Sequence, residues 1–204
     1  MMDVRKTRFT TIVLAMLLAL ALVTVITGCG KKDDTTTTAT GTSAKGQLSV
    51  AESALSTMAP DAKLLIVQTA SGTPTTATPV WAYLFGSPTS NKTYVVYASD
   101  GQVMGASEYG VLEMAEDEWA SVPGADEMKI DSDEAYTKAL AASGAKGDPN
   151  AYMMGIMMFK PKEDTSTIEP LTWQVQFDPG DSGATTSTVE VDAKTGAASI
   201  ATDQ

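Results

Sequence analysis

The tetrapeptide Gly180-Asp-Ser-Gly183 has the form of a loop that presents a serine nucleophile for acyl transfer. Such a serine needs a general base, and the chain contains no histidine, so a Ser-His-Asp triad is impossible. A Ser-Lys pair stays formally open, although no spacing singles out one lysine. The surrounding residues 178–183, Asp-Pro-Gly-Asp-Ser-Gly, are also typical of a turn between two strands. We therefore predict a turn around Ser182, no catalytic residue and no enzymatic activity.

Four methionines within residues 152–159 could in principle bind Cu(I) through their thioether sulfurs. A β-strand over this stretch would place Met154 and Met158 on one face and Met153 and Met157 on the other. Because this alternation separates the sulfurs, the pattern favours core packing, where methionine fills gaps.

Acidic residues crowd the middle of the chain and could form paired carboxylates or a Ca²⁺ site. The EF-hand pattern, with its central glycine and distal glutamate, is absent. We therefore expect a solvated acidic surface, no metal site and no cofactor. A surface that binds a small ligand or a cation remains the alternative function. The residues concerned are Glu113, Glu116, Asp117, Glu118, Asp126, Glu127, Asp131, Asp133 and Glu134.

Three tryptophans could be anchors of a binding surface. They are Trp81, Trp119 and Trp173. Trp81 and Trp173 lie on apolar faces of expected strands, which favours packing in the core.

The first 28 residues have the pattern of a secretory signal peptide. Arg5, Lys6 and Arg8 form a basic start, and residues 12–26 form an uncharged apolar stretch. This stretch is shorter than the roughly 20 residues that a comfortable membrane span needs. An uncleaved membrane anchor followed by a chance cysteine is the alternative interpretation.

Ile26-Thr-Gly-Cys29 resembles the lipobox of bacterial lipoproteins. The resemblance implies cleavage after Gly28 and a diacylglycerol on Cys29, whose two acyl chains suffice for stable anchoring. The expected location is the cell membrane or the outer membrane, with the chain on the extracytoplasmic side. Cys29 is the only cysteine, so the exported domain has no disulfide and depends on its apolar core.

The charge of the chain after cleavage excludes several classes of partner. Residues 29–204 contain 11 basic and 24 acidic residues, a formal net charge of −13, and every basic residue is a lysine. Such a surface repels phosphate backbones, so we expect no nucleic-acid partner. The missing arginine and histidine also remove the best anion clamp and the commonest general base.

Residues 29–47 contain no large apolar side chain and predict a flexible, Thr-rich tether. From residue 48 onward, one pattern occurs twice. A helix with a capping box at Ser49 and Glu52 precedes expected strands at 63–69, 80–85 and 92–98. A helix starting at Asp131 precedes expected strands at 152–159, 172–177 and 187–192. The interval 104–129 predicts an acidic connector, with a helix over 109–119 packed across both units.

Alternation in the second unit assigns its faces. Trp173, Val175 and Phe177 share one face of a strand, while Gln174 and Gln176 share the other. One face is thus apolar, as expected for a helix packed on one side of an antiparallel sheet. The first unit is apolar on both faces, which favours a sheet covered twice.

The closing motifs 173–177, Trp-Gln-Val-Gln-Phe, and 191–196, Val-Asp-Ala-Lys-Thr-Gly, resemble those of the PepSY domain. The resemblance implies an α+β fold: a tandem repeat, at 48–103 and 130–204, of one helix packed on a three- to four-stranded antiparallel sheet. PepSY domains are associated with inhibition or modulation of proteases and carry no catalytic residues. We therefore predict a non-catalytic, lipid-anchored module that binds a protein partner, such as an exported protease, through a sheet face or edge.

Overall fold

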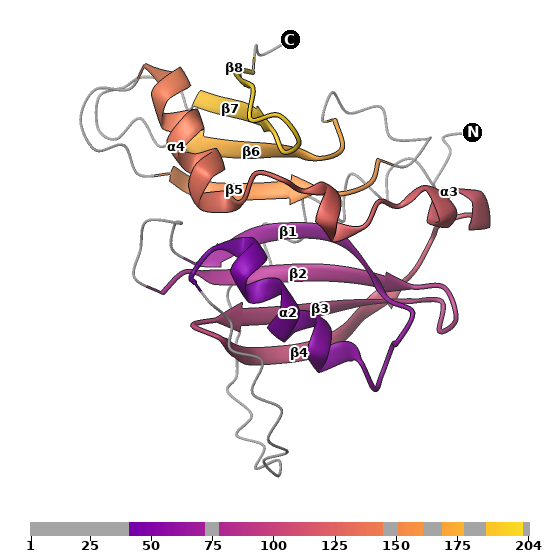
Figure 1. Cartoon of the computed structure of the whole chain (residues 1–204). Coiled ribbons are helices and arrows are strands. Elements are labelled where there is room, and N and C mark those ends of the chain that lie inside the picture. Colours follow the sequence, from indigo (N-terminus) through magenta and orange to yellow (C-terminus); the bar gives the residue numbers. More distant parts are fainter. Residues whose placement is uncertain (1–40, 72–77, 145–150, 161–168, 178–186, 202–204) are drawn as a thin grey trace, which may run out of the picture.

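A computed structural model describes residues 41–71, 78–144, 151–160, 169–177 and 187–201. Eight antiparallel strands form one continuous sheet in the order β4-β3-β2-β1-β5-β6-β7-β8 (Figure 1). The first half contains helix α2 (Ala44–Leu55) and strands β1 (Lys63–Ser71), β2 (Val80–Ser87), β3 (Lys92–Ser99) and β4 (Gln102–Val111). The second contains helix α4 (Ser132–Ser143) and strands β5 (Ala151–Met157), β6 (Thr172–Phe177), β7 (Ser187–Asp192) and β8 (Ala198–Ile200).

The predicted fold class, two separate helix-on-sheet units of the PepSY kind, is wrong. β1 and β5 pair with each other through Ile66↔Met157, Val67↔Ile156 and Gln68↔Gly155, so all the strands belong to one sheet. The physical reason is that β1 and β5 would each be an open edge in a separate unit, and mutual pairing satisfies both sets of backbone groups. The fold is therefore a single eight-stranded antiparallel sheet with its two long helices on one face.

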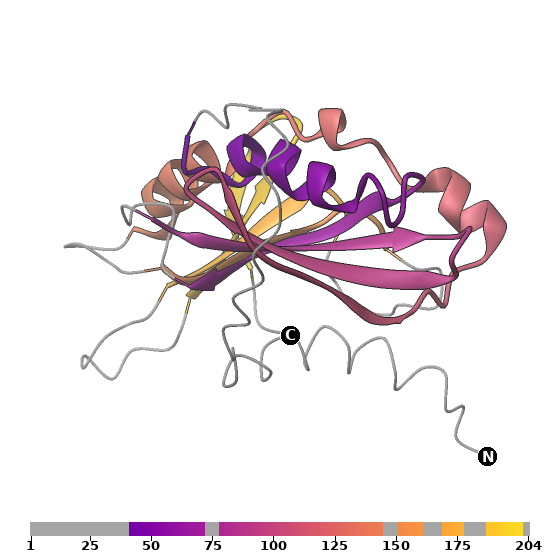
Figure 2. The ribbon, with the colours of Figure 1, turned by 90° about the horizontal axis from the view of Figure 1, so that it is seen from below.

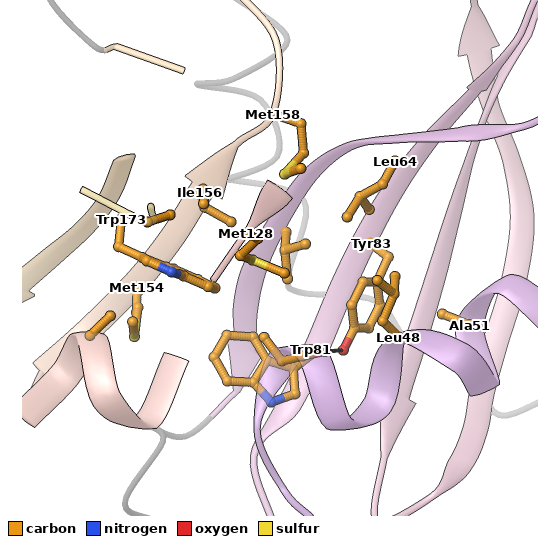
Figure 3. Packing of buried hydrophobic residues seen from close by; sticks show 14 of the residues in the cluster. Leu48, Ala51, Leu64, Trp81, Tyr83, Met128, Met154, Ile156, Met158 and Trp173 are labelled. Carbon is orange, nitrogen blue, oxygen red and sulfur yellow. Dashed lines mark hydrogen bonds between the residues drawn. The ribbon is translucent and has the colours of Figure 1, made fainter. Parts of the chain in front are cut away.

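Both long helices lie on the same face of the sheet, α2 across the first half and α4 across the second (Figure 2). One core fills the space between them and contains residues from both halves. Trp81 and Trp173 are both fully buried, and their rings meet edge to face with centroids 6.4 Å apart. Figure 3 shows the two rings in this core with Met128 close by, although Met128 belongs to neither sheet strand nor helix.

Each buried tryptophan also fixes the start of a helix. Trp81 Nε1 donates to the Thr42 carbonyl at 2.8 Å, and Trp173 Nε1 donates to the Ile130 carbonyl at 2.9 Å. Thr42 and Ile130 each precede the N-cap residue of the helix that covers their half, Ser43 for α2 and Asp131 for α4. Buried indole N–H groups need an acceptor, and these carbonyls supply one in each half.

The first helix begins earlier than its sequence suggests. α2 starts at Ala44 with Ser43 as N-cap, so Ser49 lies inside the helix and the capping box predicted there is wrong. Tertiary contacts fix this earlier start: the Ala44 N–H donates to Ser132 Oγ, and Tyr83 donates to the Ala44 carbonyl at 2.6 Å. Residues 44–47, assigned to the tether by composition, therefore belong to the folded part.

Each of the six predicted strands was confirmed within two residues at each end, whereas β4 in the connector and the short β8 were not predicted. The helix predicted over 109–119 is wrong: residues 102–111 form β4, and helix α3 covers only Glu116–Ser121. A short 3-10 helix, η1 (Ala125–Glu127), follows. Asp100 and Gly101 both have positive φ and join β3 to β4, the two-residue turn typical of a tight hairpin.

The second face of the first half is also buried, as its apolar pattern predicted. Leu65, Leu84 and Val95 form a second cluster with Leu112 and Val122 from the segment around α3. Gly86 permits this packing, because a Cβ there would lie 2.9 Å from Leu112 Cδ1 and 3.1 Å from Trp119 Cζ3. The former connector thus covers one end of the sheet rather than linking two units.

Candidate functional site

The sheet has one long open edge. β4 contains ten residues and, among the described strands, pairs only with β3. Along an antiparallel strand, successive residues direct their backbone groups alternately to either side. Half of the N–H and C=O groups of β4 therefore face away from β3, along the outer edge. The opposite edge, β8, contains only three residues, and short edges are a usual protection against strand addition.

Large apolar side chains are exposed along β4. Met104 and Val111 expose 64% and 62% of their surface, Val103 exposes 40% and Tyr109 36%. Elsewhere in the described chain, Met58 and Ile200 are the remaining large apolar residues with this degree of exposure. The concentration of four such residues on one strand distinguishes this edge from the rest of the described surface, where isolated exposed apolar residues are ordinary.

Two irregularities divide β4. The register with β3 skips Tyr109 between Gly110 and Glu108, and it skips Met104 between Gly105 and Val103. An extra residue of this kind is a β-bulge, which bends the strand and interrupts the ladder. Between the bulges, residues 105–108 pair regularly with Tyr97, Val96, Val95 and Tyr94. The regular segment is therefore bounded by the two bulged residues, both of them large and exposed.

The edge lies in acidic surroundings. Residues 93–128 contain eight acidic residues and no basic residue. Lys92 Nζ lies 2.6 Å from Glu108 Oε2, and this carboxylate raises the pKa of Lys92. Lys63 lies over the Trp119 ring, 5.1 Å from its centroid, and donates to the Trp119 carbonyl. These two lysines are thus engaged in contacts with the segment. Lys45 and Lys129 donate to its Met128 and Asp126 carbonyls, and Lys194 pairs with its Glu127.

The acidic residues singled out in the sequence lie in several elements and have separate structural roles. Asp131 caps α4, accepting from the Ser132 N–H, and also accepts from the Lys45 N–H at the start of α2. Glu127 pairs with Lys194 at 2.7 Å and Glu134 with Lys138 at 3.4 Å. Glu116, Asp117 and Glu118 occupy the first turn of α3, where negative charge favours the positive end of the helix. Asp126 lies in the 3-10 helix, Asp133 in the first turn of α4 and Glu113 between β4 and α3.

No group of three or more His, Cys, Asp or Glu side chains able to hold a metal ion occurs in the described part of the chain. The methionines follow the predicted alternation, since Met154 and Met158 are fully buried in the shared core and Met157 is outside it. Trp81 and Trp173 are core residues, as predicted, while Trp119 packs on the second apolar cluster.

Two predicted features lie outside the described residues: the lipobox with Cys29, and the turn around Ser182. None of the described helices is both long enough and apolar enough to span a bilayer. The edge strand itself was missed by sequence reasoning, although Asp100-Gly101 directly after an expected strand was a signal for a hairpin.

Comparison with known proteins gives one fold relative. No family model matches the chain, and no curated protein matches its sequence. A solved structure from Clostridium difficile 630, described as a "putative lipoprotein", is similar with a TM-score of 0.50 at 12% identity. The match covers 74% of this chain and 89% of that one. At this identity the likeness concerns the fold, and the resemblance to PepSY rests on the short motifs of the sequence alone.

Proposed function

We propose that this chain is a non-catalytic protein, anchored by lipid on the extracytoplasmic side of a bacterial membrane, that binds a protein partner. The anchor is supported by the lipobox-like residues 26–29 behind an apolar signal stretch. The description of the Clostridium difficile fold relative as a lipoprotein agrees with it.

The protein-binding role rests on one observation, the exposed ten-residue edge strand β4 with four exposed large apolar side chains. Natural proteins usually shorten, charge or cover such edges because they invite pairing with another chain. The exposed apolar edge of β4 therefore supports a role in binding a partner chain. The association of PepSY domains with proteases, brought by the sequence motifs, makes an exported protease the first partner to test.

The alternative of a cation- or ligand-binding surface has less support. The acidic residues of the middle segment are spread over helix N-termini, an N-cap and ion pairs, and the described residues bring no set of three together for a metal. No observation on the acidic surface favours a small ligand over a protein.

The anchor is tested by the substitution Cys29→Ala in cells fed with radiolabelled palmitate. We expect the label to disappear from the protein and the protein to leave the lipoprotein fraction, because Cys29 is the only thiol available for acylation. Ser43→Ala, which keeps Cys29, is the control and should retain the label. Unchanged labelling of Cys29→Ala would contradict the proposal.

The partner is tested by chemical crosslinking in the native envelope, followed by purification of the tagged chain and mass spectrometry. A protein recovered with this chain should then bind the purified full-length chain directly, with a measurable Kd. Failure of every crosslinked candidate to bind the purified chain would reject the protein-binding role while leaving the lipid anchor intact.

A further inference from the structure

We propose that β4 binds an extended, cationic segment of a partner polypeptide, which adds to the sheet as a ninth strand. This inference rests on the proposed protein-binding function and names the surface, the mode and the chemistry of the partner. In strand addition, main-chain hydrogen bonds supply affinity and alternate side chains supply specificity. The edge of β4 offers both elements.

The backbone requirement is met by the regular segment of β4 between its two bulges. Residues 105–108 pair with β3 without a register shift, and Ala106, Ser107 and Glu108 are exposed. The small side chains of Gly105, Ala106 and Ser107 leave a second backbone room to approach at the usual strand spacing of about 4.8 Å. A partner strand can therefore pair here without displacing a bulky group.

Apolar side chains flank this segment on both sides. Val103 and Met104 precede it, and Tyr109 and Val111 follow it, all of them at least 36% exposed. Burial of apolar surface contributes about 25 cal/mol per Å², so these flanking side chains would supply the non-polar part of the binding energy. The partner segment should accordingly carry apolar residues toward its ends.

The charge of the edge determines which partner fits. Asp100 lies in the turn before β4, and Glu113 and Glu116 lie just beyond its end, while Glu108 within the strand is paired with Lys92 at 2.6 Å. The acidic residues at the two ends of the strand thus outnumber the one lysine along it. A lysine- or arginine-containing segment is therefore complementary in charge, which favours its encounter and its register.

The same charges disfavour a second copy of this chain as the occupant. Antiparallel self-pairing of β4 would place the Asp100 end of one strand beside the Glu113 end of the other, bringing like charges together at both ends. Each copy would also add a net charge of −13 to the pair. Like charges that oppose each other across an interface cost free energy, so a cationic partner is the better occupant.

The test uses the full mature chain in detergent and a fluorescent nine-residue peptide in which lysine and valine alternate. Binding is followed by fluorescence anisotropy at low and at physiological ionic strength. We expect saturable binding that weakens with salt. The same peptide with glutamate in place of lysine should not bind. The lysine peptide with N-methylated amides along one edge keeps its charge and side chains but cannot complete the ladder, and it should also lose binding.

Variants of the protein locate the site. Met104→Ser combined with Val111→Ser should weaken binding by at least about tenfold, because two exposed apolar anchors are lost. Asp100→Asn combined with Glu113→Gln should weaken it by about threefold, since exposed charges contribute modestly. Ile200→Ser removes an exposed apolar side chain from β8, the opposite edge strand, and should leave the affinity unchanged.

Four results would overturn the proposal. The first is absence of binding by the lysine peptide, and the second is equal binding of its N-methylated form. The third is a dimer in sedimentation without peptide that disappears in the Met104/Val111 variant, which would assign the edge to a second copy. If a native partner still binds the variants with full affinity, the protein-binding function stands and the edge is excluded.

Discussion

At the residue scale, the closing turn of β7 shows how one carboxylate organises a hairpin. Asp192 Oδ1 accepts from the Lys194 N–H at 2.8 Å and from the Thr195 N–H at 2.7 Å. The Gly196 N–H donates to the Asp192 carbonyl, and Gly196 has a φ of +75°, a conformation that glycine adopts without steric cost. The chemistry of this turn is local to five consecutive residues.

These bonds have a consequence for acid stability. The hydrogen bond from the Thr195 N–H holds the pKa of Asp192 below its ordinary value of 3.8. The Lys194 N–H, the Thr195 side chain and the positive charge of Lys194 make smaller contributions in the same direction. A lowered pKa in the folded state stabilises the protein above the unfolded pKa, and this stabilisation is lost as pH falls through the folded pKa.

We therefore expect Asp192→Ala to lower the free energy of unfolding by about 1 kcal/mol at pH 7, and by progressively less below pH 4. Urea denaturation at a series of pH values measures both effects. Asp192→Asn keeps an acceptor at the same position and should lose less stability at pH 7. An Asp192→Ala deficit that stays constant down to pH 2 would show that the charge contributes nothing.

At the element scale, the contact between β1 and β5 joins the two halves. Gly155 lies opposite Gln68 in this pairing, and a Cβ on Gly155 would lie 3.1 Å from the Val67 carbonyl oxygen and 3.2 Å from Gln68 Cβ. Thr69 Oγ1 accepts from the Met154 N–H at 3.1 Å beside it. Sequence patterns located both strands, but nothing in a strand's own residues states which other strand it will join.

The close approach predicts that Gly155→Val destabilises the protein by about 1–3 kcal/mol, because the added carbons must displace backbone atoms of β1. Gly105→Val in β4 is the matched control. No atom lies within 4 Å of a Cβ at Gly105, so this substitution should be neutral or slightly stabilising. Thermal denaturation of the two variants measures the difference. Equal losses in Tm would mean that the contact between β1 and β5 does not restrict side-chain size at Gly155.

At the scale of the whole molecule, the shared core predicts that the two halves unfold as one cooperative unit. Residues of α2, β2, α4 and β6 belong to one buried cluster, and the Trp81 and Trp173 rings meet across it. Loss of packing in either half would therefore expose apolar surface of the other. Two independent units joined by a connector would behave differently, since each could open alone.

Hydrogen exchange distinguishes the two cases. Val175→Ala, a cavity in β6 of the second half, should increase the exchange rates of the most protected amides in β2 and in β6 alike, by roughly tenfold or more. The expectation follows because these amides exchange through global unfolding of a single sheet. Acceleration confined to β6 would instead indicate two separately unfolding units.

The sequence by itself determined the features that depend on neighbouring residues. Alternation located six strands, Asp131 marked the start of α4, and the apolar pattern of the first half predicted its double coverage. It also supplied the signal-peptide and lipobox patterns on which the proposed anchor rests. β4 was missed because its central residues are small or polar and its large apolar residues, at both ends, do not alternate with polar ones, so packing on β3 rather than its own pattern makes it a strand.

Only the tertiary structure decided the pairing of β1 with β5, the early start of α2 and the openness of the β4 edge. Each depends on contacts between residues far apart in the chain, such as Ala44 with Ser132 or Gln68 with Gly155. The residues of a strand do not by themselves fix whether it lies in the middle of a sheet or at its edge. The free energy that distinguishes them arises when backbone groups find partners, which only the assembled fold determines.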